Sequence, residues 1–358
     1  MFASLPPRRL SARVGRHGAS VALALGLTAL LTTVHPAAAT SSAVARPASS
    51  AYPVTITNCG VTTTYTQAPR RVVTTFDTTS EILLKLGLGD RIVGAYYAPK
   101  YHTEPDIDAA YHRQHVLGGP MGAPSREAVL AVHPDFVFAE APSVDFVSAM
   151  GEPSQAQLMA AGANIYALSG ECTTGAAVHA RVADIYADIL TIGRIFDVEP
   201  RAQSLVNAMQ ARVATVRRRI AGRPLVGVVG YVSGMGPLTV IGRGVYTDLM
   251  LRAGGRNVFG GVSTTYASVS REIFAAANAD VYVSARYVGA MGGMMGPQSD
   301  AAKSRFLFTT FPHTNASLNR RFVGIDGDVW NAGIRTPEAI ELLARAFHPE
   351  AFHPEAFR

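Results

Sequence analysis

The sequence predicts an α/β protein built from two three-layer α/β lobes that a single long helix joins. Predicted helices and strands alternate along most of the chain, as in domains with a parallel sheet. Between residues 199 and 221, apolar side chains recur every three or four positions, which predicts a helix about 30 Å long with one buried face. We expect this helix, at residues 199–222, to connect the lobes, because similar motifs lie on both sides of it.

One motif occurs once on each side of the long helix. Residues 125–138 and 270–283 align without a gap, and each begins with Ser-Arg-Glu and carries an aspartate further on. A weaker pair, residues 81–87 and 248–254, recurs in the same order. Two recurrences in one order favour a duplicated lobe. The alternative is a common helix–Asp–strand unit that occurs twice without a shared origin.

Residues 1–39 predict an export signal. They begin with four arginines and no acidic residue, continue with an apolar run at 19–31, and end in three alanines typical of a cleavage site. The run is too short to span a membrane, and the cysteine of a lipoprotein signal does not follow it. Residues 40–51, rich in Ser, Ala and Pro, predict a flexible leader. We therefore expect an exported protein, periplasmic or extracellular, that is associated with the cell envelope.

The charge of the chain argues against a nucleic-acid partner. The formal net charge is +6, but four arginines lie in the export signal, so the remainder is close to neutral. Hydrophobic residues make up 48% of the chain and charged residues 16%, which is typical of a globular protein with a large core.

The chain has two cysteines, Cys59 and Cys172. In an exported protein an isolated pair of cysteines favours a disulfide. The alternative, a metal or redox pair, lacks the CxxC spacing that such sites use. We therefore predict a disulfide within the first lobe.

The first lobe is predicted at residues 52–198. Its strand signals are short apolar or alternating runs, and its helix signals are apolar stripes, several of which end at glycine. Residues 103–114 are polar and are predicted to be irregular. The strands are predicted at 54–57, 61–65, 71–75, 91–97, 135–139 and 164–168, and the helices at 80–86, 125–133, 155–161 and 178–196.

The second lobe is predicted at residues 223–347, where the same signals resume. The chain then ends in a tandem repeat of Ala-Phe-His-Pro-Glu, and residues 348–358 are predicted to form a frayed tail. The strands of this lobe are predicted at 225–232, 238–241, 281–285 and 322–325, and the helices at 246–252 and 337–346.

Familiar catalytic motifs are absent, including GxxxxGK[ST], GxSxG and HExxH. Asp326-Gly327-Asp328 is predicted to be a turn, and the methionine-rich run at 291–297 a flexible loop rather than a copper site. Five histidines lack ligand spacing and are predicted to be surface or core residues: His102, His112, His115, His133 and His313. The sequence therefore predicts neither an enzyme nor a metal site.

Aromatic and arginine side chains gather just after or beside predicted strand ends. Ligands of open α/β sheets bind beyond the carboxyl ends of the strands. Tyrosine and tryptophan offer flat faces with polar tips, and arginine offers a fork of donors for anionic groups. Each side chain alone could be structural, but together they predict a ligand cleft between the lobes. The candidates are Tyr96, Tyr97, Tyr231, Arg243, Arg286, Tyr287 and Trp330.

Five stretches together resemble the substrate-binding proteins of ABC importers for ferric siderophores, haem and cobalamin. They are residues 69–73, 81–94, 125–137 and 253–259 and the segment around Asp280, and the match covers nearly all of residues 54–345. The resemblance implies two α/β lobes joined by one long helix with little hinge bending.

The same resemblance implies an exported, non-enzymatic receptor that captures an iron–siderophore complex and delivers it to an ABC importer. It further implies that Glu127 and Glu272, one on each lobe, dock onto arginines of a two-fold permease in the membrane. The alternative role of each acid is to complement the start of its helix. Haem or cobalamin in the same fold, or an exported α/β enzyme, are the rival functions. We expect a monomer without a cofactor.

Overall fold

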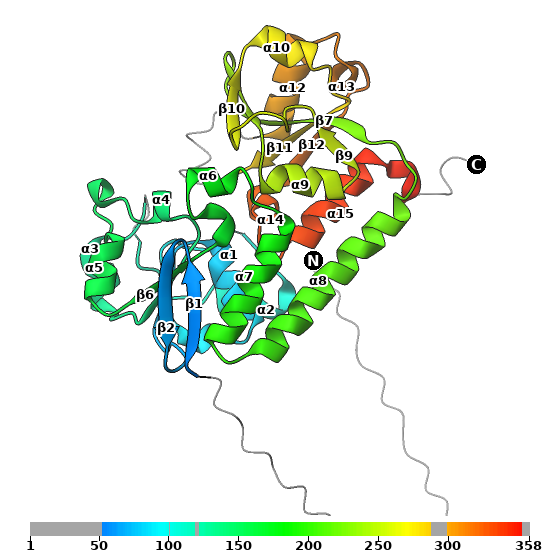
Figure 1. The fold of residues 1–358 in the computed structure, drawn as a ribbon. Coiled ribbons are helices and arrows are strands. Elements are labelled where there is room, and N and C mark those ends of the chain that lie inside the picture. Colours follow the sequence, from blue (N-terminus) through cyan, green and yellow to red (C-terminus); the bar gives the residue numbers. More distant parts are fainter. Residues whose placement is uncertain (1–51, 100, 119–121, 288–298, 353–358) are drawn as a thin grey trace, which may run out of the picture. The chain divides into compact units, whose positions relative to one another are not determined.

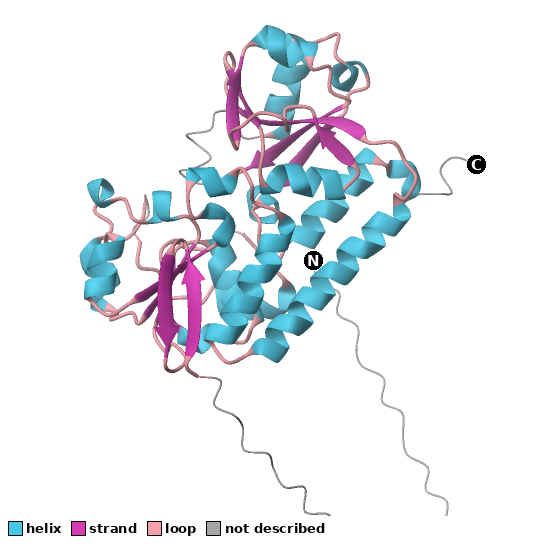
Figure 2. Ribbon diagram, in the orientation of Figure 1, coloured by secondary structure: helices cyan, strands magenta, loops and turns pink. Residues whose placement is uncertain are grey.

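The computed structural model describes residues 52–99, 101–118, 122–287 and 299–352 (Figures 1 and 2). The predicted export signal, the leader and the methionine-rich run at 291–297 lie outside the described residues. Within the described ranges, no helix is both long and apolar enough to cross a membrane.

The first half of the chain forms a hairpin and a parallel sheet. Strands β1 (Val54–Asn58) and β2 (Val61–Tyr65) pair antiparallel, as predicted. The sheet has the order β4-β3-β5-β6, and every pair in it is parallel. Its strands are short apolar runs, as expected for strands covered on both faces. They are β3 (Val72–Thr74), β4 (Ile92–Ala95), β5 (Phe136–Ala139) and β6 (Asn164–Ala167).

Helices cover both faces of the first sheet, which gives three layers. Val129 and Leu158, from α3 and α5, pack with Val137 on one face. The other face packs against α1 and α7. The helical segments are α1 (Asp77–Lys85), η1 (Gly89–Arg91), α2 (Pro105–Tyr111), α3 (Arg126–Ala131), α4 (Pro142–Asp145), η2 (Ser148–Met150), α5 (Gln155–Ala160), η3 (Ser169–Glu171), α6 (Thr174–Ala177) and α7 (Val182–Ile195).

Helix α2 corrects the prediction that residues 103–114 are irregular. Pro105 occupies the first turn, where its missing N–H costs nothing. Only Ile107 and Tyr111, four positions apart, are buried on this helix. A single apolar pair among polar residues is too weak a stripe for periodicity to reveal.

The second half forms a six-stranded mixed sheet. Its path is β10-β8-β7-β11-β12, and β9 also pairs with β7. The pairs β9–β7, β7–β11 and β11–β12 are parallel, whereas β8 pairs antiparallel with both β7 and β10. The sequence did not predict β9 and β10, which are short and partly polar. The strands are β7 (Val226–Ser233), β8 (Leu238–Ile241), β9 (Gly255–Asn257), β10 (Tyr266–Val269), β11 (Val281–Arg286) and β12 (Phe322–Asp326).

The second sheet is also covered on both faces, so both lobes have three layers. Phe274 of α10 and Leu307 of α12 pack with Tyr282 on one face, while α9 and α15 cover the other. The predicted turn at residues 326–328 is instead the junction of β12 and α14. The helices are α9 (Val245–Arg252), α10 (Arg271–Ala276), α12 (Asp300–Thr310), α13 (Asn315–Leu318), α14 (Gly327–Trp330), α15 (Thr336–Phe347) and η4 (Pro349–Ala351).

Residues 348–352 correct the prediction of a frayed tail. His348 is buried and its imidazole lies 3.2 Å from the carbonyl oxygen of Gly254. Glu350 pairs with Arg223 at 2.6 Å, and the ring of Phe352 lies under the guanidinium of Arg345. These contacts hold this part of the chain end against the second lobe; residues 353–358 lie outside the described range.

The long helix α8 (Glu199–Arg219) runs between the chain segments that form the two sheets, as predicted. Its buried stripe contains Ala202, Val206, Met209, Val213 and Val216. The helix packs along α7 of the first half and α15 of the second half. The predicted fold class, two α/β lobes joined by one long helix, is therefore confirmed.

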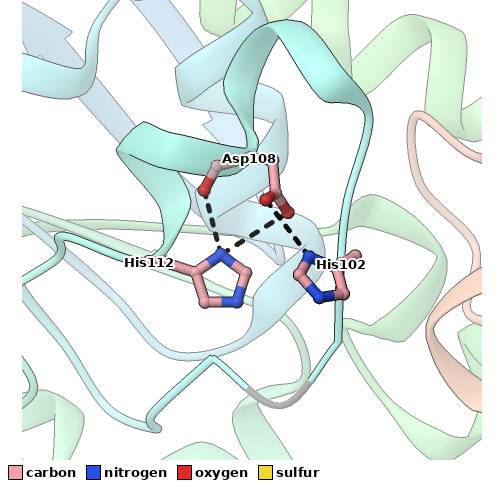
Figure 3. A group of neighbouring side chains, drawn as sticks. All are labelled: His102, Asp108 and His112. Carbon is pink, nitrogen blue, oxygen red and sulfur yellow. Dashed lines mark hydrogen bonds and ion pairs between the residues drawn. The ribbon is translucent and has the colours of Figure 1, made fainter. Parts of the chain in front are cut away.

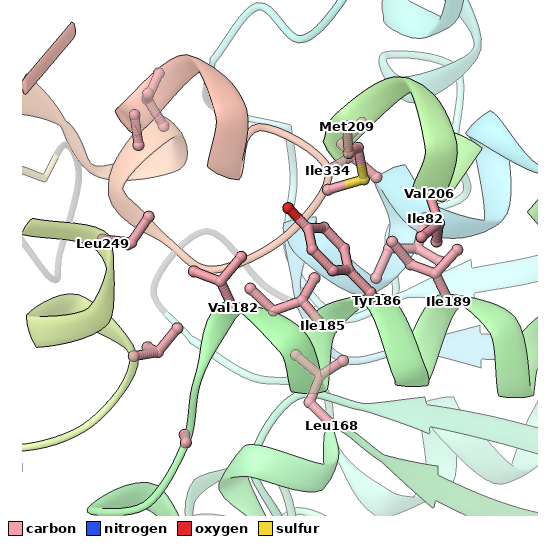
Figure 4. Close-up of a cluster of buried hydrophobic side chains, with 14 of the residues drawn as sticks. Ile82, Leu168, Val182, Ile185, Tyr186, Ile189, Val206, Met209, Leu249 and Ile334 are labelled. Atoms are coloured by element: carbon pink, nitrogen blue, oxygen red, sulfur yellow. The ribbon is translucent and has the colours of Figure 1, made fainter. Parts of the chain in front are cut away.

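One hydrophobic core is shared by both lobes (Figure 4). Ile82 and Ile189 enter it from the first lobe, Met209 from α8, and Leu249 and Ile334 from the second lobe. In addition, the main chain of Val182 donates a hydrogen bond to the carboxylate of Asp248 at 3.0 Å. The lobes are thus packed on each other around α8.

The disulfide prediction is confirmed. Cys59 and Cys172 are bridged, with their Cα atoms 5.0 Å apart. The bridge ties the turn of the β1–β2 hairpin to the segment after η3, and Asn58 adds a hydrogen bond of 2.8 Å from the main chain of Ala167. The hairpin is thereby fixed to the edge strand of the first sheet.

Candidate functional site

Two of the tyrosines predicted to contact a ligand lie inside hydrophobic cores. Tyr96 is 1% exposed and packs with Val73 and Val137. Tyr231 is 3% exposed, and its hydroxyl donates to the carbonyl oxygen of Gly234 at 2.8 Å. Buried side chains offer no surface to a ligand, so we do not carry these two into the proposed site.

The two predicted arginines differ in their surroundings. Arg286 donates to Asp326 at 2.7 Å and also pairs with Asp300, so its charge is already balanced within the second lobe. Arg243 is exposed, and its main-chain N–H donates to Thr264 at 2.9 Å. Of the two, Arg243 is the one whose guanidinium is open to an outside group.

Trp330 begins a row of aromatic rings on the second lobe. It is 3% exposed and stacks on Tyr246, with ring centroids 5.0 Å apart and planes 4° from parallel. Tyr246 in turn lies 6.4 Å from Tyr266, which is half exposed. Trp330 is therefore the buried end of the row and Tyr266 the open end.

Two carboxyl groups of the first lobe raise the pKa of Tyr246 in this row. Glu140 follows β5 directly and Glu171 ends η3 after β6. Burial raises the pKa of Tyr246 well above its usual value, and the charges of Tyr266, Tyr287, Glu140 and Glu171 raise it further. Burial is also the main cause that raises the pKa of Glu140 well above its ordinary range. Groups from both lobes therefore meet in one region.

Tyr97 and Tyr287 belong to the same region. Burial, followed by the charges of Glu152, Asp145 and Glu140, raises the pKa of Tyr97 to about 12. Burial likewise raises the pKa of Tyr287, and Tyr266 and Glu140 add to the effect.

We call this set the aromatic–acidic site. It consists of Tyr97, Glu140, Glu171, Tyr246, Tyr266, Tyr287 and Trp330.

The composition of the aromatic–acidic site suits a flat or bulky ligand that carries no negative charge. Aromatic rings offer apolar faces, and tyrosine hydroxyls offer hydrogen bonds at their edges. The ionisable side chains that act on Tyr266 and Tyr287 are acidic or phenolic, among them Glu140. An anionic ligand would meet like charge or would have to pair with protonated carboxyls.

Sequence reasoning found Tyr97, Tyr287 and Trp330 but missed the other four members. Glu140 and Glu171 follow strands, so the rule that strand ends bind ligands could have found them. Tyr246 lies in the first turn of α9 and Tyr266 starts an edge strand that was not predicted. Neither tyrosine has a local signal in the sequence. The two come together only in the fold, where β10 pairs with β8.

Glu127 and Glu272 occupy equivalent places on the two lobes. Each follows an N-cap serine, with Ser125 accepting from Ala128 at 3.2 Å and Ser270 accepting from Ile273 at 3.3 Å. Both glutamates are exposed. Main-chain hydrogen bonding at the helix start lowers the pKa of Glu127, and the hydroxyl of Ser270 lowers that of Glu272. Both are thus surface carboxylates held ionised at neutral pH.

Two histidines that the sequence analysis treated as scattered lie beside one carboxylate (Figure 3). The loop before α2 places His102 beside the carboxylate of Asp108, and His112 follows Asp108 by one helical turn. Spacing in the sequence hides this cluster, because His102 reaches it only through the fold of the loop.

A family model described as periplasmic binding protein matches residues 72–323. The match includes the first sheet, α8 and every member of the aromatic–acidic site except Trp330, and it ends within β12 of the second sheet. No protein among the curated sequences matches the chain.

Several solved structures share the fold. A periplasmic binding protein from Veillonella parvula is 23% identical, with a TM-score of 0.72 over 83% of this chain and 97% of that chain. An ABC-type Fe3+-hydroxamate transport protein from Saccharomonospora viridis is 22% identical, with a TM-score of 0.67 over 83% and 99%. A periplasmic haem-binding protein from Roseiflexus is 21% identical, with a TM-score of 0.60 over 79% and 99%.

Proposed function

Because the chain belongs to the periplasmic binding protein family, we propose that it is an exported receptor that captures a ferric siderophore and delivers it to an ABC importer. Residues 1–39 would direct its export, and the captured chelate would be its cargo rather than a cofactor. Members of this family bind and carry ligands, which fits the absence of a known catalytic motif in the sequence. The fold neighbour from Saccharomonospora viridis, which serves Fe3+-hydroxamate transport, supports this choice of cargo.

The observation that carries the proposal is the aromatic–acidic site. Its members follow the carboxyl ends of strands in both lobes or lie beside them, where ligands of open α/β sheets bind. Tyr266, which is half exposed, would cover the apolar rim of a bulky chelate, with Tyr246 and the buried Trp330 stacked behind it. Arg243 is exposed and lies close to Tyr246 in the sequence, so we keep it as a ligand contact at the edge of the aromatic–acidic site.

The acidic members of the site suggest which class of siderophore is bound. A ferric trihydroxamate complex is neutral around its metal, whereas a ferric tricatecholate is strongly anionic and haem carries two propionates. An anionic chelate could bind only while Glu140 and Glu171 are protonated, the form that their raised pKa favours, whereas a neutral or cationic chelate is tolerated in either form. We therefore favour a hydroxamate over a catecholate, with haem or cobalamin as the alternative cargo in the same fold.

A fluorescence titration tests the cargo. Trp330 is the only tryptophan, and a ligand seated on Tyr246 should quench it because the two rings are stacked. Ferric hydroxamate should quench the protein with saturation at one equivalent, and ferric catecholate should not. Saturable binding of haem or cobalamin alone would select the alternative cargo, and no binding of any of these would refute the proposed function.

Matched variants test the site by calorimetry. Tyr246→Ala should lower the affinity about tenfold, which corresponds to about 1.4 kcal/mol of lost stacking. Tyr231→Phe changes a buried tyrosine outside the site and should leave the affinity unchanged. Replacing Glu140 and Glu171 together by glutamine should keep hydroxamate binding within a few-fold and raise the affinity for ferric catecholate.

For delivery, we propose that Glu127 and Glu272 contact basic residues of the permease. Each lobe presents one exposed carboxylate on an equivalent helix start, which suits a two-fold partner. Reversing both charges to lysine should leave ligand affinity within a few-fold and stop uptake by cells. Glu199→Lys, at the start of α8, is the control and should leave uptake intact. Loss of ligand binding in the double variant would place these residues in the ligand site instead.

A further inference from the structure

We propose that His102, Asp108 and His112 form a binding site for a divalent transition metal such as Zn²⁺, distinct from the aromatic–acidic site. The imidazole Nδ1 of His102 lies 3.2 Å from one carboxylate oxygen of Asp108. Nδ1 of His112 lies 3.4 Å from the other oxygen. One ligand atom from each of the three residues can be chosen so that all lie within 4.8 Å of one another (Figure 3).

These distances are close to those around a tetrahedral zinc ion. With metal–ligand bonds of about 2.0–2.2 Å, neighbouring ligand atoms in a tetrahedron lie roughly 3.3 Å apart. The distance of 3.2 Å between Nδ1 of His102 and one carboxylate oxygen already meets this value. Nδ1 of His112 lies 3.4 Å from the other oxygen and 3.0 Å from the main-chain carbonyl oxygen of Asp108, so the carboxylate or this ring has to turn for both histidines to share an ion with one oxygen. The histidines would have to approach each other by at most about 1.5 Å. Two imidazoles and a carboxylate are ligands that Zn²⁺ accepts, and water would complete the tetrahedron.

Two of the three ligands are held in place by the surrounding chain. Asp108 lies in α2 and His112 is the helical C-cap residue one turn later, the spacing at which two side chains of a helix share a face. The main-chain N–H of Thr103 donates to Asp108 at 2.9 Å, which orients the carboxylate from outside the cluster. Such contacts behind the ligands fix metal sites in a productive geometry.

The third ligand is free to adjust. The side chain of His102 is 90% exposed, so a metal ion can enter from solvent and draw the ring inward. Without metal, the same three residues form a hydrogen-bonded cluster in which Asp108 accepts from a histidine. The alternative is that this cluster only stabilises the loop before α2. A titration with Zn²⁺ distinguishes this structural role from metal binding.

A bound metal would act on the loop that leads to the aromatic–acidic site. The carbonyl oxygen of His102 accepts a hydrogen bond from Arg335 at 3.3 Å, and Arg335 also pairs with Asp328 on α14. Tyr101, the preceding residue, is among the groups that raise the pKa of Tyr287. Metal binding at His102 would therefore fix a segment that contacts the second lobe through Arg335.

The test uses untagged, chelator-washed protein without cargo, titrated with Zn²⁺ in a calorimeter and against a chromophoric chelator. One equivalent should bind with a Kd in the micromolar range or tighter. His102→Ala and Asp108→Asn should each weaken binding at least tenfold. His102→Ala removes an exposed side chain and should not disturb folding. His313→Ala, which removes an exposed histidine elsewhere, should leave binding unchanged.

A second readout guards against weak surface binding. Saturating Zn²⁺ should raise the melting temperature of the wild type and of His313→Ala but not of His102→Ala, because a ligand stabilises only the state that binds it. Failure to bind one equivalent, or equal losses in His102→Ala and His313→Ala, would overturn the site. Neither result depends on whether the protein carries a siderophore.

Discussion

The two copies of the Ser-Arg-Glu motif fold alike but are tied to their lobes by different partners. Both begin with a serine cap and turn through a left-handed residue, His133 in one copy and Asn278 in the other. Asp135 then accepts from the main-chain N–H of Arg71 at 2.8 Å. Asp280 accepts from the main-chain N–H of Gly227 at 2.8 Å.

The difference lies in what completes each junction. In the first copy, the guanidinium of Arg71 reaches back to the carbonyl oxygen of Val132 at 2.6 Å. In the second, Asn315 donates from its side chain to Asp280 at 2.9 Å and from its main chain to Asn278. In both copies the aspartate accepts a hydrogen bond from the main chain of a neighbouring segment, whereas the residues that make the remaining contacts differ between the lobes.

The lobes also differ in how they handle buried charge and covalent links. The only two cysteines of the chain join within the first lobe. That lobe also buries the carboxyl of Asp188, whereas the second lobe buries the ammonium of Lys303 in addition to carboxylates such as Asp248. Variants at these groups should therefore affect the stability of the protein in different ways.

Removing the disulfide should destabilise the protein most. The bridge closes a sequence separation of 113 residues, for which the chain-entropy model gives about 4–5 kcal/mol. The double variant Cys59→Ser, Cys172→Ser should lose roughly this much in denaturant unfolding. Hydrogen exchange should rise first in β1 and β2, which the bridge anchors. A loss below about 1 kcal/mol would mean that the hairpin is held by its other contacts.

The buried carboxyl of Asp188 should make stability depend on pH. Burial raises its pKa to about 7, although hydrogen bonds from Tyr166 and Ser169 oppose the shift. The folded state then holds a proton that the unfolded state releases near pH 4, so stability falls between about pH 4 and 7. Asp188→Asn should flatten this fall, by about 4 kcal/mol at most. Asp90→Asn, at an exposed position, should leave the profile unchanged.

Lys303 should give the second lobe a slope of the opposite sign. Its ammonium donates to Ser284 and Ala285, yet burial lowers its pKa. The unfolded state therefore binds the proton more tightly, and stability should rise with pH through the window between the folded pKa and about 10.4. Lys303→Met should remove that alkaline rise in urea unfolding and leave the acidic part of the profile as it was.

The aspartates of the two motif copies should matter equally. Asp135→Ala leaves main-chain donors of Arg70 and Arg71 without a partner, and Asp280→Ala does the same to Gly227 and Asn315. Each variant should lose about 2 kcal/mol in denaturant unfolding. Asn315→Ala should cost less than Asp280→Ala, because the main-chain N–H of Gly227 keeps its acceptor. Unequal losses in the free energy of unfolding would show that the two aspartates contribute differently to stability despite their similar geometry.

The smallest expected effect is at the serine caps. Ser125→Ala and Ser270→Ala each remove one acceptor for a helix N–H, at a cost of about 1 kcal/mol. Threonine at the same positions should restore most of the loss. A difference larger than the error of chemical unfolding would contradict the equivalence of α3 and α10.

The sequence was sufficient for the parts of the fold that local chemistry determines. The run that became β5 is continuously apolar, the run that became β11 is apolar at its buried positions except Ser284, and the stripe of α8 is regular. The sequence was not sufficient to predict elements whose secondary structure depends on tertiary contacts. Polar β10 is a strand because it pairs with β8, and α2 is a helix whose exposed face is nearly all polar.

The same limit explains the candidate site. Strand-end position selected Tyr97 and Trp330, but it could not tell a partly exposed ring such as Tyr97 from buried rings such as Tyr96 and Trp330. Tyr246 and Trp330 stack although they are far apart in the sequence. Only the fold makes this contact, because it brings α14, which follows β12, next to the start of α9.

The core that α8 shares with both lobes has a consequence for how the protein can come apart. Met209 lies in one apolar cluster with residues of the first lobe such as Ile189 and of the second lobe such as Leu249. Separating the halves would expose this surface to water on both sides, at roughly 25 cal/mol for each Å² uncovered. Neither half is therefore an independent folding unit. The protein should melt in one calorimetric transition, and either half produced alone should aggregate.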